Sequence, residues 1–406
     1  MLSPAVCFML GRAPPSPDQA CATFTTAVTT AIATSAKQIH SMNTPASALT
    51  LAATLREHFA RVVLPIWRGP GFNAALKLPY EAVSADDHRP LPAERYRAMA
   101  CARQLFVFSQ AGETAHAEVL FNALVHYFQD KQRGGWFYSV DAQGAPLDTT
   151  KDLYTHAFLV FACAEYGARS GNRDALNLVH STSALIEDRF AAQHGLLNAA
   201  LDAGFSSVTG TPIQNPLMHL TEAWLAARAA TGDSAFDTAL RKLAEAIERT
   251  FVHAPTGCIA ELPLGADDNR LEPGHQFEWF WLVKQAGALL DGSGLDDALS
   301  RAFDFAQQHG VDPVTGGVCA SLDEAGAIKD ATQRIWAQSE YLRALATRDD
   351  AAARAVLPGQ IERFQQRFLH AKGWYECKTA AGDVSRADMP STTPYHLATA
   401  YAALPA

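Results

Sequence analysis

Residues 272–282 read Glu-Pro-Gly-His-Gln-Phe-Glu-Trp-Phe-Trp-Leu, and the prediction of the fold starts from this stretch. The Pro-Gly pair marks a turn from which a helix can begin. His275 and Glu278 are three residues apart on the first turn of that helix, so their side chains share one face. Apart from Glu278, residues 277–283 are large and apolar, which is typical of a helix buried on all sides. Two ionisable groups at the start of a buried helix indicate a functional site.

Short segments that begin with glycine and continue with mainly apolar or small residues recur along the whole chain. Each interval between them has room for two helices of about 15–20 residues and their connections. A single helix hairpin cannot bury its own apolar face, so neighbouring hairpins must stack. The segments begin at Gly71, Gly135, Gly195, Gly257, Gly317 and Gly373.

Three of these intervals contain two clear helical segments each, and the two differ in character. The first is apolar nearly all round, whereas the second is amphipathic. Apolar helices inside a ring of amphipathic ones predict an all-α fold, an (α/α)6 barrel of six helix hairpins. An open solenoid is the alternative, but it would show less contrast between the two kinds of helix. The expected pairs are 150–171 with 173–193, 216–232 with 234–251, and 278–291 with 295–310, and three of these helices end at Gly171, Gly232 and Gly310.

The domain prediction separates residues 1–45 from the rest of the chain. They are rich in Ala, Thr, Ser and Pro and show no helical apolar stripe, so we predict a poorly ordered N-terminal extension. Met42 is an alternative start, because a patterned helix begins soon after it. Residues 46–406 are expected to form a single (α/α)6-barrel catalytic domain.

The composition excludes several classes of partner. The 33 Lys and Arg and 42 Asp and Glu residues give a net charge of −9 without a basic cluster, which argues against nucleic acids and anionic membranes. The seven cysteines contain no Cys-x-x-Cys pair, so a reducing, cytoplasmic location is expected. No apolar run approaches the ~20 residues of a membrane helix. The sequence leaves the oligomeric state open, with a homodimer as one option.

Polar residues interrupt the apolar helices near their starts, which would all meet at one end of a closed barrel. Arginine is costly to bury without a partner or a ligand, so Arg103 amid apolar neighbours is notable. Simpler interpretations stay open: His156 as a core residue or a link between repeats, and Glu222 and Glu340 as buried ion-pair partners. A zinc site of His219, His275 and His396 is possible by residue type but is disfavoured because no His-x-x-x-His spacing occurs. The candidate site residues are Arg103, Asn215, His219, Glu222, His275, Glu278, Trp336 and His396.

Several motifs resemble those of the N-acylglucosamine 2-epimerase superfamily, which includes mannose isomerases, sulfoquinovose isomerases and cellobiose 2-epimerases. Together they are specific, although each alone would be weak, and the resemblance runs from about residue 60 to the C-terminus. The last of them, Thr-Pro-Tyr-His, is more similar to the aldose–ketose isomerase branch. The motifs are Ala-Arg-Gln-Leu-Phe-Val-Phe-Ser at 102–109, Gly-Gly-Trp at 134–136, Lys-Asp-Leu-Tyr-Thr-His-Ala-Phe at 151–158, Asn-Pro-Leu-Met-His-Leu-Thr-Glu at 215–222, Glu-Pro-Gly-His-Gln-Phe-Glu-Trp at 272–279 and Thr-Pro-Tyr-His at 393–396.

The resemblance implies an (α/α)6 barrel that acts on a monosaccharide. We expect a sugar isomerase that interconverts D-mannose and D-fructose through a cis-enediol, with an N-acylglucosamine 2-epimerase as the alternative. His396 would move the proton between C2 and C1, and Arg103 would stabilise the enediolate. His275, oriented or tuned by Glu278, would serve ring opening or protonation on the other side. No metal or organic cofactor is required for this chemistry. The remaining four candidates, Asn215, His219, Glu222 and Trp336, would bind the hydroxyl groups and the ring face of the sugar.

Two other classes of function remain open. A glycoside hydrolase would use paired carboxylates such as Glu222 and Glu278. A non-catalytic helical scaffold would leave the cluster of polar residues at the helix starts unexplained.

Overall fold

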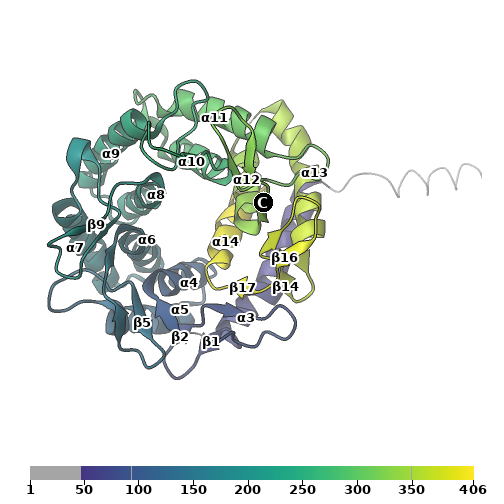
Figure 1. Ribbon diagram of the computed structural model, residues 1–406. Coiled ribbons are helices and arrows are strands. Elements are labelled where there is room, and N and C mark those ends of the chain that lie inside the picture. Colours follow the sequence, from purple (N-terminus) through teal and green to yellow (C-terminus); the bar gives the residue numbers. More distant parts are fainter. Residues whose placement is uncertain (1–46, 93, 349) are drawn as a thin grey trace, which may run out of the picture. The chain divides into compact units, whose positions relative to one another are not determined.

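The computed structural model describes residues 47–92, 94–348 and 350–406, so the extension expected at 1–45 lies outside the described residues. Residues Ala48–Ala406 form one compact unit. Within it, each inner helix packs on the next, and α14 packs back on α4 to close the ring (Figure 1). This closed ring confirms the all-α (α/α)6 barrel. The inner helices are α4 (Ala98–Gln110), α6 (Leu153–Ser170), α8 (Gln214–Thr231), α10 (Pro273–Ala286), α12 (Ile335–Thr347) and α14 (Thr393–Ala403).

The outer helices show how the ring closes. Five inner helices pair with the helix that follows them in sequence, whereas α14 is the last helix and packs on α2 and the π-helical turn η1. The sixth pair is therefore not the sequential hairpin that was expected but a pair formed by the two ends of the barrel unit. The outer helices are α2 (Ala48–His58), α5 (Thr114–Phe128), α7 (Arg173–Arg189), α9 (Ala235–Phe251), α11 (Leu295–Gly310) and α13 (Ala351–Phe368), with short helices η1 (Phe59–Val63), α3 (Leu64–Arg68), η2 (Gln193–Gly195) and η3 (Gly287–Leu290).

The ends of the helices correct two details of the sequence analysis. The helix expected at 278–291 begins earlier, at Pro273, because proline is favoured at the first helical position. Gly171 and Gly232 have φ near +70° and end α6 and α8 in the left-handed conformation. Gly310 does not end its helix in the left-handed conformation. It is the last residue of α11, and a Cβ there would lie 2.5 Å from Cγ of Pro273.

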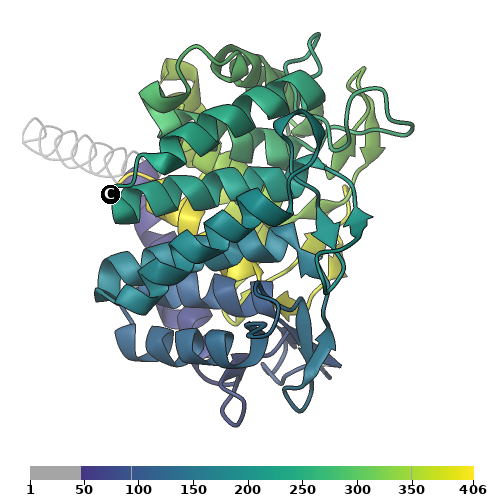
Figure 2. The same ribbon diagram turned by 90° about the vertical axis from the view of Figure 1, so that its left-hand side faces the viewer.

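Short strands and loops gather at the end of the barrel where the inner helices begin, on the right of Figure 2. Three-stranded sheets have the orders β4-β5-β6, β7-β8-β9 and β12-β15-β16, and the other pairs are β1-β2, β10-β11, β13-β14 and β17-β3. No helix in the described ranges is both long and apolar enough to cross a membrane. The strands are β1 (Phe72–Asn73), β2 (Leu78–Pro79), β3 (Ala82–Val83), β4 (Arg95–Arg97), β5 (Ser139–Asp141), β6 (Pro146–Asp148), β7 (Lys151–Asp152), β8 (Ala200–Leu201), β9 (Val208–Gly210), β10 (Ser321–Leu322), β11 (Ile328–Asp330), β12 (Gln333–Arg334), β13 (Leu369–His370), β14 (Gly373–Trp374), β15 (Cys377–Lys378), β16 (Val384–Arg386) and β17 (Met389–Pro390).

The fourth residue of three inner helices ties each helix to the glycine segment before it. His156 Nε2 accepts the Trp136 N–H at 3.1 Å, and Gln276 Oε1 accepts the Ile259 N–H at 2.8 Å. Gln338 Oε1 likewise accepts a backbone N–H from a residue of the preceding glycine segment. His156 is therefore the link between repeats that one interpretation of the sequence predicted. These bonds hold the start of each helix, and hence its polar side chains, against the loop layer.

Candidate active site

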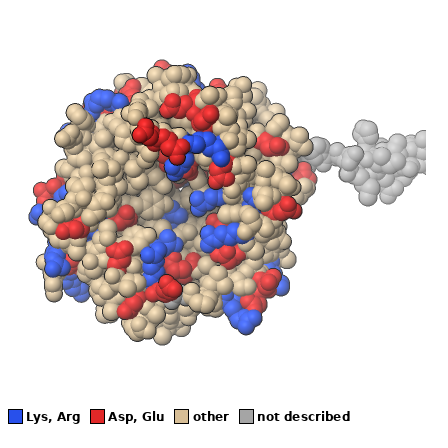
Figure 3. Space-filling model, in the orientation of Figure 1, with Lys and Arg blue, Asp and Glu red and all other residues tan. Residues whose placement is uncertain are grey.

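A cavity of about 270 Å³ opens at the end of the barrel where the inner helices begin. Figure 3 looks onto this end and shows a hollow at its centre, with Lys and Arg side chains close to the rim. Seven of the eight candidate residues line the cavity: Arg103, Asn215, His219, His275, Glu278, Trp336 and His396. The cavity is also lined by Tyr154, Glu261, Arg270, Glu272, Arg334, Glu376, Thr392 and Thr393.

His275, on the first turn of α10, is held by carboxylates. Its Nδ1 donates to Glu261 Oε1 at 2.7 Å, and Glu272 Oε2 lies 3.5 Å from the same nitrogen. Burial alone would lower the pKa of His275, but the charges of Glu261 and Glu272 outweigh burial and raise it to about 9. His275 is therefore a positively charged imidazolium at neutral pH. The orienting contact comes from Glu261 and not from Glu278, which can raise the pKa of His275 only through the charge of its ionised form.

His396, on the first turn of α14, has the opposite charge state. Its Nδ1 donates to Glu340 Oε1 at 2.8 Å, which leaves Nε2 as the acceptor nitrogen. Burial, followed by the charge of Arg103, lowers the pKa of His396 well below its usual value. Burial also raises the pKa of Glu340, but we assign a carboxylate because its second oxygen accepts from Arg343 at 3.2 Å. His396 is therefore a neutral imidazole that can accept a proton.

Arg103 is a buried cation without a carboxylate partner in the described part of the chain. Its Nη2 donates to Tyr154 Oη at 2.6 Å and its Nη1 to the Thr392 carbonyl at 3.4 Å. The guanidinium carbon lies 4.2 Å from the centre of the Phe158 ring and 4.8 Å from that of Tyr395. A permanent charge that is 5% exposed and balanced only by neutral groups is suited to an anion that develops in the cavity.

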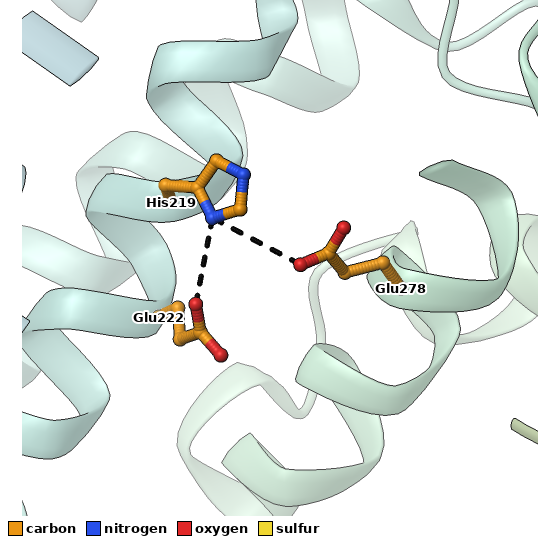
Figure 4. A group of neighbouring side chains, drawn as sticks. All are labelled: His219, Glu222 and Glu278. Atoms are coloured by element: carbon orange, nitrogen blue, oxygen red, sulfur yellow. Dashed lines mark hydrogen bonds and ion pairs between the residues drawn. The ribbon is translucent and has the colours of Figure 1, made fainter. Parts of the chain in front are cut away.

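His219 and Glu278 both line the cavity, and their side chains lie close together in Figure 4. Glu278 Oε1 lies 3.9 Å from His219 Nδ1, and neither carboxyl oxygen of Glu278 has a hydrogen-bond partner in the described chain. Burial, with the charges of Glu340 and Glu222, raises the pKa of Glu278 well above its usual value. Burial lowers the pKa of His219 to about 4. The raised pKa favours the protonated form of Glu278, which has an O–H to donate, and His219 is a neutral imidazole near neutral pH.

Glu222 is the candidate residue that does not line the catalytic cavity, so its expected contact with sugar hydroxyls needs correction. It lies one turn below His219 and accepts hydrogen bonds from His219 Nδ1 at 3.4 Å, Arg343 Nη2 at 3.4 Å and Tyr395 Oη. Arg343 also binds Glu340, at 3.2 Å. Both glutamates are thus buried partners of Arg343, which was the other interpretation of these residues. Their own bonds to Tyr395 and His396 add α14 to the network.

Comparison with known proteins identifies the family. The profile of the N-acylglucosamine 2-epimerase (GlcNAc 2-epimerase) family matches residues 81–400. The chain belongs to the N-acylglucosamine 2-epimerase family. It is 27% identical over 361 residues to a mannose-6-phosphate isomerase of Rhizobium meliloti, covering 82% of this chain and 91% of that protein. It is 31% identical over 201 residues to a D-mannose isomerase of Thermobifida fusca, covering 44% and 48%.

The fold agrees with that of a solved family member. The cellobiose 2-epimerase of Bacillus thermoamylovorans B4167 superposes with a TM-score of 0.79 at 19% identity, covering 87% of this chain and 98% of that one. The protein is thus a carbohydrate isomerase or epimerase with the barrel of its family.

Several residues that line the cavity of the present protein were not predicted as site residues. Two of them could have been found from the sequence. Glu261 and Glu376 are acids inside the glycine segments that begin at Gly257 and Gly373, whose other residues are mainly apolar or small. Glu376 accepts hydrogen bonds from Trp374 Nε1 at 3.1 Å and from a threonine of α14. An acid at that place in a repeat is unusual enough to have been singled out.

His219, His275 and His396 do not belong to one group of potential metal ligands in the described ranges. Three groups of His and acidic side chains in the described ranges bring potential metal ligands together, and each contains only one histidine. Each of the three histidines is hydrogen-bonded through Nδ1 to a different glutamate. The histidines are thus separate acid–base groups within one cavity.

Proposed function

We propose that the protein is an aldose–ketose isomerase that interconverts D-mannose and D-fructose. The observation that carries this proposal is the pair of histidines in one cavity, with His275 protonated and His396 neutral. Isomerisation needs a base at C2 and an acid at the carbonyl oxygen, and imidazoles of opposite charge supply both. The relatives named mannose isomerase and mannose-6-phosphate isomerase support a substrate of this kind.

The proton transfers balance in two steps. His396 Nε2 removes the C2 proton of the open-chain aldose while His275 donates a proton to O1, which gives the cis-enediol. His396 then returns its proton to C1 as the O2 hydroxyl proton passes to His275, which gives the ketose. One hydrogen has moved from C2 to C1 and one from O2 to O1. Arg103 stabilises negative charge on the oxygens between these steps.

The other lining residues fit roles in binding. The indole of Trp336 lies with its ring centre 5.0 Å from that of His275 and 5.5 Å from that of His396, so a sugar ring that stacks on it lies next to both. Asn215 Oδ1 has no partner in the described chain and can accept a sugar hydroxyl. Glu278, whose oxygens have no partner in the described chain, and neutral His219 offer further hydrogen bonds in the cavity.

The charge of His275 favours isomerisation over 2-epimerisation. An epimerase would need His275 to deliver a proton to carbon on the opposite face of C2. A proton donor with a pKa of about 9 is a weak acid for carbon, but it still donates well to oxygen. A hydrolase with Glu222 and Glu278 as its pair of carboxylates is not favoured, because Glu222 lies outside the cavity and is bound to Arg343.

Proton NMR in D2O tests the proposal. The purified protein is incubated with D-mannose and, separately, with N-acetylmannosamine. We expect D-fructose from mannose, with deuterium gained at C1 where the shuttled proton exchanges with solvent. Formation of N-acetylglucosamine from N-acetylmannosamine, with mannose unchanged, would assign the protein to the epimerase alternative. No change in either sugar would contradict the proposed isomerase.

A further inference from the structure

A second cavity, here called the distal cavity, lies at the end of the barrel where the inner helices end, opposite the loop layer of Figure 2. Its wall includes Gln110, the last residue of α4, and Thr347, the last residue of α12. Its volume is about 560 Å³, against about 270 Å³ for the catalytic cavity, and the two share no lining residue in the described chain. The reaction proposed above gives the distal cavity no role.

The charged side chains of the distal cavity are already paired with groups of opposite charge. Glu165 accepts a hydrogen bond from Arg169, and Glu222 accepts one from Arg343. Arg343 also has a second carboxylate partner, Glu340, at 3.2 Å. An anionic ligand would be repelled by these glutamates and a cationic ligand by Arg343, so the charges favour a neutral ligand.

Other polar groups of the wall lack partners and can bind hydroxyl groups. The side-chain amides of Gln110 and Gln285 make no hydrogen bond in the described chain. Arg343 has five N–H donors but only two acceptors there, and its buried Nε has none. An amide offers both donors and an acceptor, and a hydroxyl group matches either. These groups therefore fit a ligand that carries several hydroxyls.

Three aromatic side chains supply the apolar part of the wall. Phe106 and Phe161 are stacked with their ring centres 4.5 Å apart. Trp281 is half-buried, and its ring centre lies 3.3 Å from the guanidinium carbon of Arg343. Pockets for small molecules combine such aromatic surfaces with a few polar groups that fix the ligand's orientation. The C–H faces of a sugar ring suit the aromatic surface, and its hydroxyls suit the amides.

We propose that the distal cavity is a second, non-catalytic binding site for a neutral monosaccharide or cyclic polyol. None of the residues that line it in the described chain is a histidine, so the proton transfers of the catalytic cavity are not expected there. The inference goes beyond the isomerase function and does not depend on it, because it concerns binding alone.

A buried network lies between the distal cavity and the catalytic cavity. Glu222 lines the distal cavity and accepts from His219 Nδ1 at 3.4 Å. Glu340 is bound to Arg343 and accepts from His396 Nδ1 at 2.8 Å. A sugar in one cavity can therefore disturb the other through these bonds, and a measurement has to report on each cavity separately.

Fluorine NMR of the full chain labelled with 5-fluorotryptophan provides one reporter for each cavity. Of the seven tryptophans, Trp281 lines the distal cavity and Trp336 lines the catalytic cavity. Spectra of Trp281→Phe and Trp336→Phe assign the two signals. The ligand is 1,5-anhydro-D-mannitol, a cyclic polyol without a carbonyl group, which an aldose–ketose isomerase cannot convert. We expect the Trp281 signal to shift and to saturate, with a Kd on the order of 1–10 mM.

Variants of the wall assign this shift to the distal cavity. Gln110→Ala removes one hydrogen-bonding group and should weaken the binding seen at Trp281 by roughly 3- to 10-fold. Ala346→Phe fills the cavity and should abolish the Trp281 shift. Neither should change the titration of Trp336. Gln143→Ala is the matched control, because Gln143 is an exposed glutamine that lines neither cavity.

Two results would overturn the distal site. One is a Trp281 signal that does not respond to the polyol. The other is a Trp281 shift that is the same in the wild type, Gln110→Ala and Ala346→Phe, because it would then originate in the catalytic cavity and reach Trp281 through the buried network. The isomerase function is tested separately by the conversion of D-mannose, so the failure of one proposal is distinguishable from the failure of the other.

Discussion

His275 and His396 are the same side chain, yet their surroundings hold them in opposite charge states. Both are buried, which disfavours the charged form of each. Two nearby carboxylates, Glu261 and Glu272, reverse this effect for His275, whereas the cation Arg103 reinforces it for His396. The difference between acid and base in this site is therefore set by the charge of the neighbouring residues.

His396→Ala tests the assignment of the base. Without the imidazole the proposed base at C2 is lost, so kcat should fall by roughly 10²- to 10⁴-fold, as for other general bases. The rate is measured as fructose formation from mannose. His180→Ala is the control, because His180 is an exposed residue of the outer helix α7. Retention of most activity in the His396 variant would show that another group takes the C2 proton.

Glu261→Gln tests the assignment of the acid. His275 must hold a proton, so kcat/KM should fall as the pH rises through its pKa of about 9. Removing the Glu261 charge lowers that pKa, and the alkaline limb of the pH profile should move to lower pH. The control is Glu324→Gln, since Glu324 is an exposed acid beside His253. An alkaline limb that stays in place would contradict the role of Glu261.

The hydrogen bonds at the starts of the inner helices determine how firmly the site is held. In Gln276→Leu, the buried N–H and C=O of Ile259 lose their partner, at a cost of about 2 kcal/mol or more in the free energy of unfolding. Urea unfolding measures this loss. Gln285→Leu, on the same helix but exposed, should change the stability by no more than about 0.5 kcal/mol. Equal effects of the two substitutions would count against the tie between repeats.

The contact between the end of α11 and the start of α10 places His275. In Gly310→Ala, the new Cβ would meet Pro273 Cγ at 2.5 Å, so α10 must shift or the core must strain by about 1–3 kcal/mol. We expect a lower melting temperature and a reduced kcat. Gly359→Ala is the matched control, because its Cβ has open space within α13 and alanine favours the helix. A Gly310 variant with unchanged kcat would show that α10 does not depend on this contact.

At the scale of the whole molecule, the two ends of the barrel unit close the ring. Arg56 on α2 donates to the carbonyl groups of Tyr401, Leu404 and Pro405 at 3.2, 2.6 and 2.9 Å. These bonds pair carbonyl groups at the end of α14 that would otherwise lack partners. A cation there also suits the helix dipole.

Arg56→Ala should destabilise the barrel by about 1–3 kcal/mol, because three charge-assisted hydrogen bonds are lost. Thermal unfolding and urea unfolding both measure the change. Arg61→Ala is the control on the neighbouring turn, since Arg61 makes only an exposed pair with Glu57 worth at most about 1 kcal/mol. If both variants unfold alike, closure does not depend on Arg56.

Some residues of the site could be predicted from the sequence, and others could not. Residues at helix starts, such as His275 and His396, could be placed because every inner helix begins at the same end of a closed barrel. Glu261 was missed because it lies in a loop segment, and its contact with His275 crosses between elements. The expectation that Glu278 orients or tunes His275 was wrong about the orienting contact, which Glu261 makes. The reason is related: spacing on one helix shows which side chains share a face, but not which partner from another element lies closer.

The sequence by itself determined the six-fold repeat, the division into inner and outer helices and the end at which polar side chains collect. Those properties follow from local periodicity and from the need to bury apolar faces. Only the tertiary structure decided that the last pair joins the two ends of the barrel unit, that Glu222 is a partner of Arg343, and that His275 and His396 differ in charge. These depend on distances between residues far apart in the chain, because electrostatic energy in a buried site changes steeply with a few ångströms.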